Sequence, residues 1–109
     1  MTSDANDNSN LSVQIADDGV VVVRGDIDIA GGPILDAALT SAEPVGDVIV
    51  DLGGVLFVDS SGLRCLLSAS RRAAARGATV SLRGVRPTVA RLFEITGTTE
   101  QFVIETIHD

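Results

Sequence analysis

Residues 48–67 read VIVDLGGVLFVDSSGLRCLL, and this stretch decides the fold. The apolar run at 48–52 has the length and the β-branched composition of a buried strand. From Leu63 onward the apolar residues recur at helical spacing, with Leu66 and Leu67 on one face. The stretch therefore predicts a strand, a connection at 53–57, and a helix that begins beside two adjacent serines.

The predicted helix start has its own sequence signature. Asp59 is a favourable N-cap residue, because its carboxylate accepts hydrogen bonds from free backbone N–H groups of the first turn. Val58 and Leu63 occupy the two positions of a hydrophobic staple. A cap and a staple explain the helix start without any function. They do not explain why serine and then Gly62 follow the cap, since both residue types are poorer helix formers than alanine. A site that needs exposed hydroxyls and close approach would explain them.

Composition limits the functions that this chain can have. At 109 residues it is long enough for one domain with a real core. A net charge of −7 argues against binding to nucleic acid and favours a basic protein partner. No apolar run approaches the roughly 18 residues of a membrane span. Because no leader-like pattern opens the chain and the one cysteine, Cys65, cannot form an internal disulfide, we expect a cytoplasmic location and a structural role for Cys65.

The flanking segments complete an α/β pattern. Polar residues 1–10 predict a mobile tail before the domain at 11–109. The remaining elements are predicted as a hairpin of strands at 11–15 and 20–23, helices that begin near Pro33 and Pro87, and strands at 79–82 and 102–104, the last at a sheet edge. Glycines at 77 and 97 are predicted to end helices.

The resulting order is β-β-α-β-α-β-α-β, which predicts a single α/β domain. Its sheet should be mixed and mostly parallel, with about five strands and with the helices mainly on one face. Because a strand, helix and strand in succession require a crossover connection, the strands at 48–52 and 79–82 should be parallel.

Four carboxylates near predicted strand ends invite an enzymatic interpretation: Asp26, Asp28, Asp51 and Asp59. Such groups bind metals or transfer protons. Against this, the sole histidine, His108, lies beside the C-terminal residue, and no nucleophile with its base or phosphate-cradling glycine loop occurs. We therefore expect no enzyme, no catalytic residues, no metal and no cofactor. A small nucleotide-binding or hydrolytic domain that uses these carboxylates is the alternative from another class.

Several of these segments, in this order, resemble the STAS domain family, specifically the bacterial anti-sigma factor antagonists. The resemblance rests on residues 48–52, 54–58, the Asp-Ser-Ser-Gly motif with its following leucine at 59–63, and residues 86–93. The Gly-Asp-Ile-Asp stretch at 25–28 is similar to that family's Gly-Glu-Leu-Asp, with Asp26 in place of the usual glutamate. The likeness covers roughly residues 11–104.

This resemblance implies a function. The family's antagonists bind an anti-sigma factor that is also a serine kinase, which frees a sigma factor. The kinase phosphorylates the first serine of the motif and ends the binding, and a PP2C-type phosphatase restores it. Carried over by position, the acceptor is Ser60, and Asp28, Asp59, Ser61 and Gly62 lie with it at the partner-binding surface. Because the two serines are adjacent, spacing alone does not choose between Ser60 and Ser61.

A non-switching STAS domain is the nearest alternative. Such a domain would be a scaffold subunit of a transport or stress-signalling complex, and its serine would serve only at the helix start. The complete Asp-Ser-Ser-Gly motif favours the phosphorylation switch.

Overall fold

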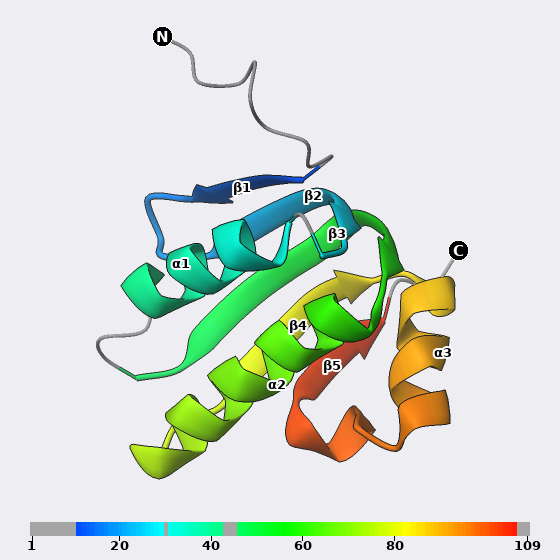
Figure 1. The fold of residues 1–109 in the computed structure, drawn as a ribbon. Coiled ribbons are helices and arrows are strands. Elements are labelled where there is room, and N and C mark those ends of the chain that lie inside the picture. Colours follow the sequence, from blue (N-terminus) through cyan, green and yellow to red (C-terminus); the bar gives the residue numbers. More distant parts are fainter. Residues whose placement is uncertain (1–10, 30, 43–45, 107–109) are drawn as a thin grey trace, which may run out of the picture.

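A five-stranded mixed sheet is the base of the structure, a computed structural model that describes residues 11–29, 31–42 and 46–106. The strands lie in the order β1-β2-β3-β4-β5, with β1 antiparallel to β2 and all other neighbours parallel (Figure 1). The strands are β1 (Ser12–Ile15), β2 (Val21–Ile27), β3 (Val48–Val58), β4 (Val80–Val85) and β5 (Val103–Thr106). The predicted hairpin, parallel crossover and C-terminal edge strand are confirmed. The tail predicted at 1–10 and His108 lie outside the described residues.

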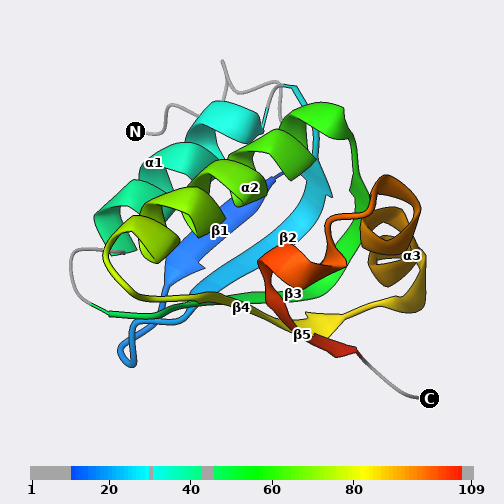
Figure 2. The ribbon, with the colours of Figure 1, turned by 90° about the horizontal axis from the view of Figure 1, so that it is seen from below.

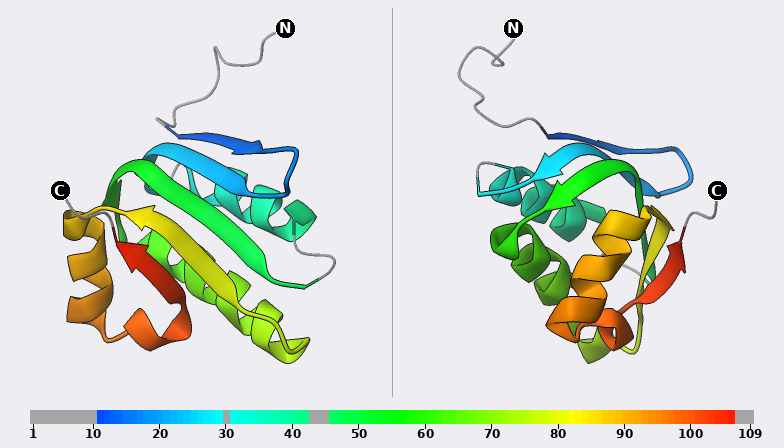
Figure 3. Two further views of the ribbon diagram at one scale, coloured as in Figure 1. Left: turned by 180° about the vertical axis from the view of Figure 1, so that it is seen from behind. Right: turned by 90° about the vertical axis from the view of Figure 1, so that its right-hand side faces the viewer.

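The helices cover one face of this sheet. Helices α1 (Gly32–Ala42) and α2 (Ser60–Ala75) lie side by side over it, and α3 (Pro87–Thr96) lies near the end where β3 finishes (Figure 2). A 3-10 turn, η2 (Thr99–Gln101), leads into β5. Seen from behind, the opposite face of the sheet carries none of the helices in the described part of the chain (Figure 3). The predicted fold class, including helices mainly on one face, is confirmed.

Strand alternation places the core between the sheet and the helices. Successive side chains of a strand point to opposite faces, and in β3 Val48, Val50 and Leu52 are buried in the core. Ile49 and Asp51, between them, point to the helix-free face and are only half-buried. This alternation identifies which residues of the sheet face solvent.

The connection predicted at 53–57 is wrong, because β3 continues without a break to Val58. Gly54 pairs with Arg24 of β2, and the Arg24 side chain crosses so close that a Cβ on Gly54 would lie 2.8 Å from its Cγ. At Gly53 the nearest atom of β4, the Gly84 carbonyl oxygen, would lie 3.9 Å from an added Cβ, which is an ordinary van der Waals distance. Gly54 therefore makes room for β2, and the ladder to β2 overrides the tendency of the glycine pair to form a turn.

Both predicted helix ends are confirmed at glycines with positive φ. Gly77 has φ 78° and Gly97 has φ 70°, a conformation that glycine adopts without steric cost. After α2, the N–H of Gly77 donates to the Ala74 carbonyl and the N–H of Ala78 to the Ala73 carbonyl, which closes the helix. No helix within 11–29, 31–42 and 46–106 combines the length and the apolar run that a membrane crossing requires.

Candidate functional site

The α2 start, residues 59–62, is organised by its N-cap. The Asp59 Oδ1 accepts a hydrogen bond from the Gly62 N–H at 3.0 Å, and the Asp59 carbonyl accepts from the Leu63 N–H at 2.9 Å. Val58 and Leu63, on either side, are both buried in the core. The predicted cap is confirmed, and it fixes the direction in which the first helical turn points.

The α2 start also rests directly on the end of β2. The Asp59 N–H donates to the Ile27 carbonyl at 3.0 Å, and Ile27 pairs with Val58 across the two strands. A Cβ on Gly62 would lie 2.7 Å from that same Ile27 carbonyl oxygen and closer still to the Ile27 side chain. Real Cβ atoms do not come this close, so only glycine allows the helix to sit here. Gly62 is itself buried.

Two hydroxyls follow the cap, and their exposure differs. Ser60 is exposed and Ser61 is half-buried. Neither hydroxyl has a hydrogen-bond partner among the residues that the structure describes. Ser70, further along the same helix, is only 8% exposed, and its Oγ donates to the Gln101 carbonyl at 2.5 Å. The Ser60 hydroxyl is thus the free and accessible one, whereas the Ser70 hydroxyl is used by the fold.

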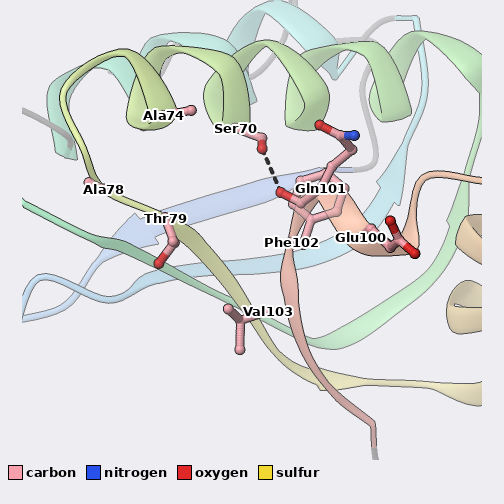
Figure 4. A pocket seen from close by; sticks show the side chains of 8 residues that line it. All are labelled: Ser70, Ala74, Ala78, Thr79, Glu100, Gln101, Phe102 and Val103. Carbon is pink, nitrogen blue, oxygen red and sulfur yellow. Dashed lines mark hydrogen bonds between the residues drawn. The ribbon is translucent and has the colours of Figure 1, made fainter.

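A cavity of about 240 Å³ lies beside Ser70 rather than beside Ser60. Its walls come from the C-terminal half of α2 and from the junction of η2 and β5 (Figure 4). Ala74, one of the lining residues, is roughly 20 Å along the helix from Ser60 at 1.5 Å per residue. The cavity is therefore separate from the α2 start.

The four carboxylates of the enzymatic interpretation do not form one cluster. Asp28 follows β2, and its Oδ1 accepts from the Gly31 N–H at 3.0 Å, which shapes the turn into α1. Asp26 and Asp59 lie at the same end of β2 and β3, since Asp26 pairs with the strand residue Phe57. Asp51 is instead well inside β3, on the helix-free face, with its Oδ1 accepting from the Gly53 N–H at 2.8 Å.

No three of the histidine, cysteine, aspartate and glutamate side chains in the described part of the chain are placed to hold a metal ion. The alternative of a nucleotide-binding or hydrolytic domain therefore gains no support from the placement of Asp51.

Cys65 connects the two helices next to the α2 start. Its half-buried thiol donates to the Gly32 carbonyl, with Sγ 3.5 Å from the oxygen. Burial raises the pKa of the Cys65 thiol, and the negative charge of Asp36 raises it further, so the protonated donor form is favoured. Cys65 therefore has the structural role that its sequence position predicts.

Sequence reasoning missed three exposed apolar residues at this end of the molecule. Leu56 and Phe57 lie near the end of β3, and Ile29 follows Asp28. One signal was available, because the uninterrupted apolar run from Val55 to Val58 does not alternate as a strand with one solvent-facing side should. The sequence prediction instead places most of this run in the connection at 53–57.

The five-stranded fold and the Asp-Ser-Ser-Gly motif at 59–62 together define a STAS domain. A family model described as "Mlab, STAS domain" matches residues 11–105, and the chain belongs to this family.

Known relatives include the anti-sigma-B factor antagonist of Staphylococcus aureus, which is 33% identical over 79 residues, or 71% of this chain and 73% of the relative. The anti-sigma-B factor antagonist of Bacillus subtilis is 29% identical over 92 residues, or 83% of this chain and 84% of the relative. These relatives are regulators, which confirms the expectation that the chain is not an enzyme.

The solved structures of SpoIIAA, an anti-sigma factor antagonist from Bacillus, share the fold. Its unphosphorylated form superposes with a TM-score of 0.70 at 22% identity, covering 91% of this chain and 89% of SpoIIAA. Its phosphorylated form superposes with a TM-score of 0.65 at 21% identity, covering 91% and 92%. At this identity the likeness concerns the fold alone.

Proposed function

We propose that this chain is a cytoplasmic anti-sigma factor antagonist. It binds an anti-sigma factor that is a serine kinase, releases a sigma factor, and is switched off when that kinase phosphorylates Ser60. A PP2C-type phosphatase restores the binding. The observation that carries the proposal is the free, exposed Ser60 hydroxyl at the α2 start. Family membership and the anti-sigma-B factor antagonists among its relatives support it.

Charge explains how phosphorylation would end the binding. A phosphate brings about −1.5 to −2 charges to a surface that already carries Asp59 and Asp28. At about 6 Å and an effective dielectric constant near 20, each pair of unit charges is worth up to roughly 3 kcal/mol, and less after screening by salt. Because about 1.4 kcal/mol is already a tenfold change in affinity, repulsion of an acidic partner group, together with steric bulk and the lost hydroxyl contact, is sufficient.

The antagonist itself would tolerate the phosphate. Ser60 is the first residue of α2, where backbone N–H groups and the helix dipole favour an anion. SpoIIAA supports this point, because its phosphorylated and unphosphorylated forms both share the present fold. The effect of phosphorylation would therefore fall on the complex and not on the stability of the domain.

Exposure supports Ser60 over Ser61 as the acceptor. A kinase must surround the hydroxyl that it modifies, and Ser61 is half-buried where Ser60 is exposed. Asp28, Asp59 and Ser61 remain candidates for direct contact with the partner. Gly62 is buried against Ile27, so its part in this proposal is to position the other residues.

Phosphorylation followed by binding tests the proposal. The chain is incubated with ATP and each purified anti-sigma factor kinase of its own organism, and the modified residue is mapped by mass spectrometry. We expect one phosphate on Ser60, none on S60A, and one phosphate, still on Ser60, in S61A. The phosphorylated chain and S60D should bind the kinase at least tenfold more weakly than S60A, and treatment with a PP2C-type phosphatase should restore binding.

Three results would contradict this proposal in part or as a whole. If S60A, S60D and the phosphorylated chain bound equally well, Ser60 would be no switch, and a non-switching scaffold would be the better description. If the phosphate were on Ser61, the acceptor assignment would be wrong. Absence of binding to every anti-sigma factor would refute the function as a whole.

A further inference from the structure

Three large apolar side chains near the end of the sheet next to Ser60 are exposed. Ile29 is 76% exposed, Leu56 is 66% exposed and Phe57 is 51% exposed. We call these three residues the apolar patch. Exposed side chains of this size are common singly on protein surfaces, but several at one place indicate an interaction site.

A β-bulge brings two of them to the surface. Gly25 of β2 pairs with Val55 of β3, and the next residue, Asp26, pairs with Phe57, so Leu56 is the extra residue of β3. Without the bulge, Leu56 and Phe57 would point to opposite faces of the sheet. With it, both are exposed even though β3 is the central strand. Bulges that redirect side chains are frequent next to functional sites.

The apolar patch lies near the α2 start in the chain and in the strand register. Leu56 and Phe57 precede Ser60 so closely that their Cα atoms lie within roughly 14 Å of it even in a fully extended chain. Ile29 comes two residues after Ile27, and the Ile27 carbonyl accepts the Asp59 N–H at 3.0 Å. We therefore expect a partner that covers Ser60 to reach the apolar patch as well.

Three carboxylates lie near the apolar patch and limit what it can bind. Asp26, Asp28 and Asp59 lie at the same ends of β2 and β3, and no arginine in the described part of the chain forms an ion pair with them. Phosphate backbones and anionic lipid surfaces would be repelled. A second copy fits less well, because a two-fold interface would bring the same three carboxylates from each copy to one interface with no basic partner for them among these residues. A different protein, with an apolar recess edged by arginine or lysine, fits both features.

We propose that the apolar patch is the main source of affinity for the partner, and that the partner offers an apolar recess with a basic rim. This inference rests on the proposed function, in which the partner is the anti-sigma factor. It assigns the carboxylates and Ser60 to the rim, where charge governs specificity and association rate, and assigns affinity to Ile29, Leu56 and Phe57. Phosphorylation then acts at the rim of an interface whose centre is apolar.

The test uses the unphosphorylated chain and the purified anti-sigma factor that modifies it in the experiment above. Affinities are measured by calorimetry for L56S and I29S, with I95S as the matched control, because Ile95 is 73% exposed on α3. We expect L56S and I29S each to weaken binding by about tenfold or more and I95S to change it by less than about twofold. Raising the salt concentration should weaken binding of the wild-type chain, since the rim is charged.

The outcomes separate this inference from the proposed function. If the wild-type chain binds and is phosphorylated but L56S and I29S bind like I95S, the function stands and the apolar patch is not the interface. If no anti-sigma factor binds the wild-type chain, both fail. Sedimentation of the chain with anionic phosphatidylglycerol vesicles, or a dimer that L56S abolishes, would assign the patch to a membrane or to a second copy and would overturn the proposal. Ile29 lies outside the strands, so I29S keeps the test valid if L56S disturbs the bulge.

Discussion

Helices α2 and α3 each follow a parallel strand and begin at the same end of the sheet, yet their starts are built differently. At the α2 start the Asp59 carboxylate caps the helix by accepting from the Gly62 N–H. At the start of α3 the N-cap residue is Arg86, whose side chain makes no capping hydrogen bond and instead donates from Nε to the Gly53 carbonyl at 2.8 Å. The polar side chain at the start of α3 thus binds a neighbouring strand, whereas the polar side chain at the start of α2 caps its own helix.

The first and third residues of the two helices also differ. The first residue of α2 is the exposed Ser60, and the first residue of α3 is Pro87, which has no N–H to leave unpaired. The third is Gly62 in α2 and the buried, core-packing Val89 in α3. A helix start that only has to pack can follow the α3 pattern. Packing against Ile27 explains the glycine of the α2 start, but it does not explain the two hydroxyls, which indicate a requirement beyond folding.

Replacing Gly62 with alanine should give the largest effect on stability. The added Cβ meets the backbone oxygen and the side chain of Ile27, neither of which can move without shifting β2. We expect G62A to lower the free energy of unfolding by about 3 kcal/mol, although alanine is normally the better helix former. Urea denaturation measures this, with S61A as the matched control and an expected change below about 0.5 kcal/mol. If G62A were as stable as S61A, the glycine would have to be explained by partner contact instead.

The α2 start was predictable because its determinants are local. The N-cap at Asp59, the helical spacing after it and the glycine beyond the helix end all act within a few residues, so the sequence displays them directly. The parallel pairing of β3 and β4 followed from the crossover rule. The fold class could therefore be derived from local signals and one rule of topology.

The parts that were missed depend on contacts between distant residues. Gly53 and Gly54 remain in β3 because the strand pairs with β2 here and the Arg24 side chain crosses Gly54, and no local signal in the glycine pair reports this. The bulge at Leu56 likewise depends on the register with β2, and it decides that an apolar residue is exposed. For the candidate site, the motif identified Ser60 and Ser61 together, and only the fold distinguishes their exposure.

Substitutions at Asp59 separate the cap from the charge. Asparagine accepts the same hydrogen bond without the negative charge, so D59N should change the free energy of unfolding by only a few tenths of a kcal/mol, while D59A should lower it by about 1 kcal/mol. Thermal melting of both variants measures the difference. Equal losses in D59N and D59A would show that charge at the helix N-terminus, and not the hydrogen bond, stabilises the α2 start.

The smallest effect is expected at Arg86, and it sharpens the contrast between the two helix starts. R86M keeps the length of the side chain but removes the donor to the Gly53 carbonyl, and since Arg86 is only half-buried, water can replace the donor. We expect a loss of about 0.5 kcal/mol, at the low end for a hydrogen bond, and no change in affinity for the anti-sigma factor. The matched control is R91M, an exposed arginine on the same helix, for which no change in stability is expected. A loss as large as that of G62A would mean that packing of Val89 does not by itself hold α3 in place, and that its start depends on one polar contact as the α2 start depends on its cap.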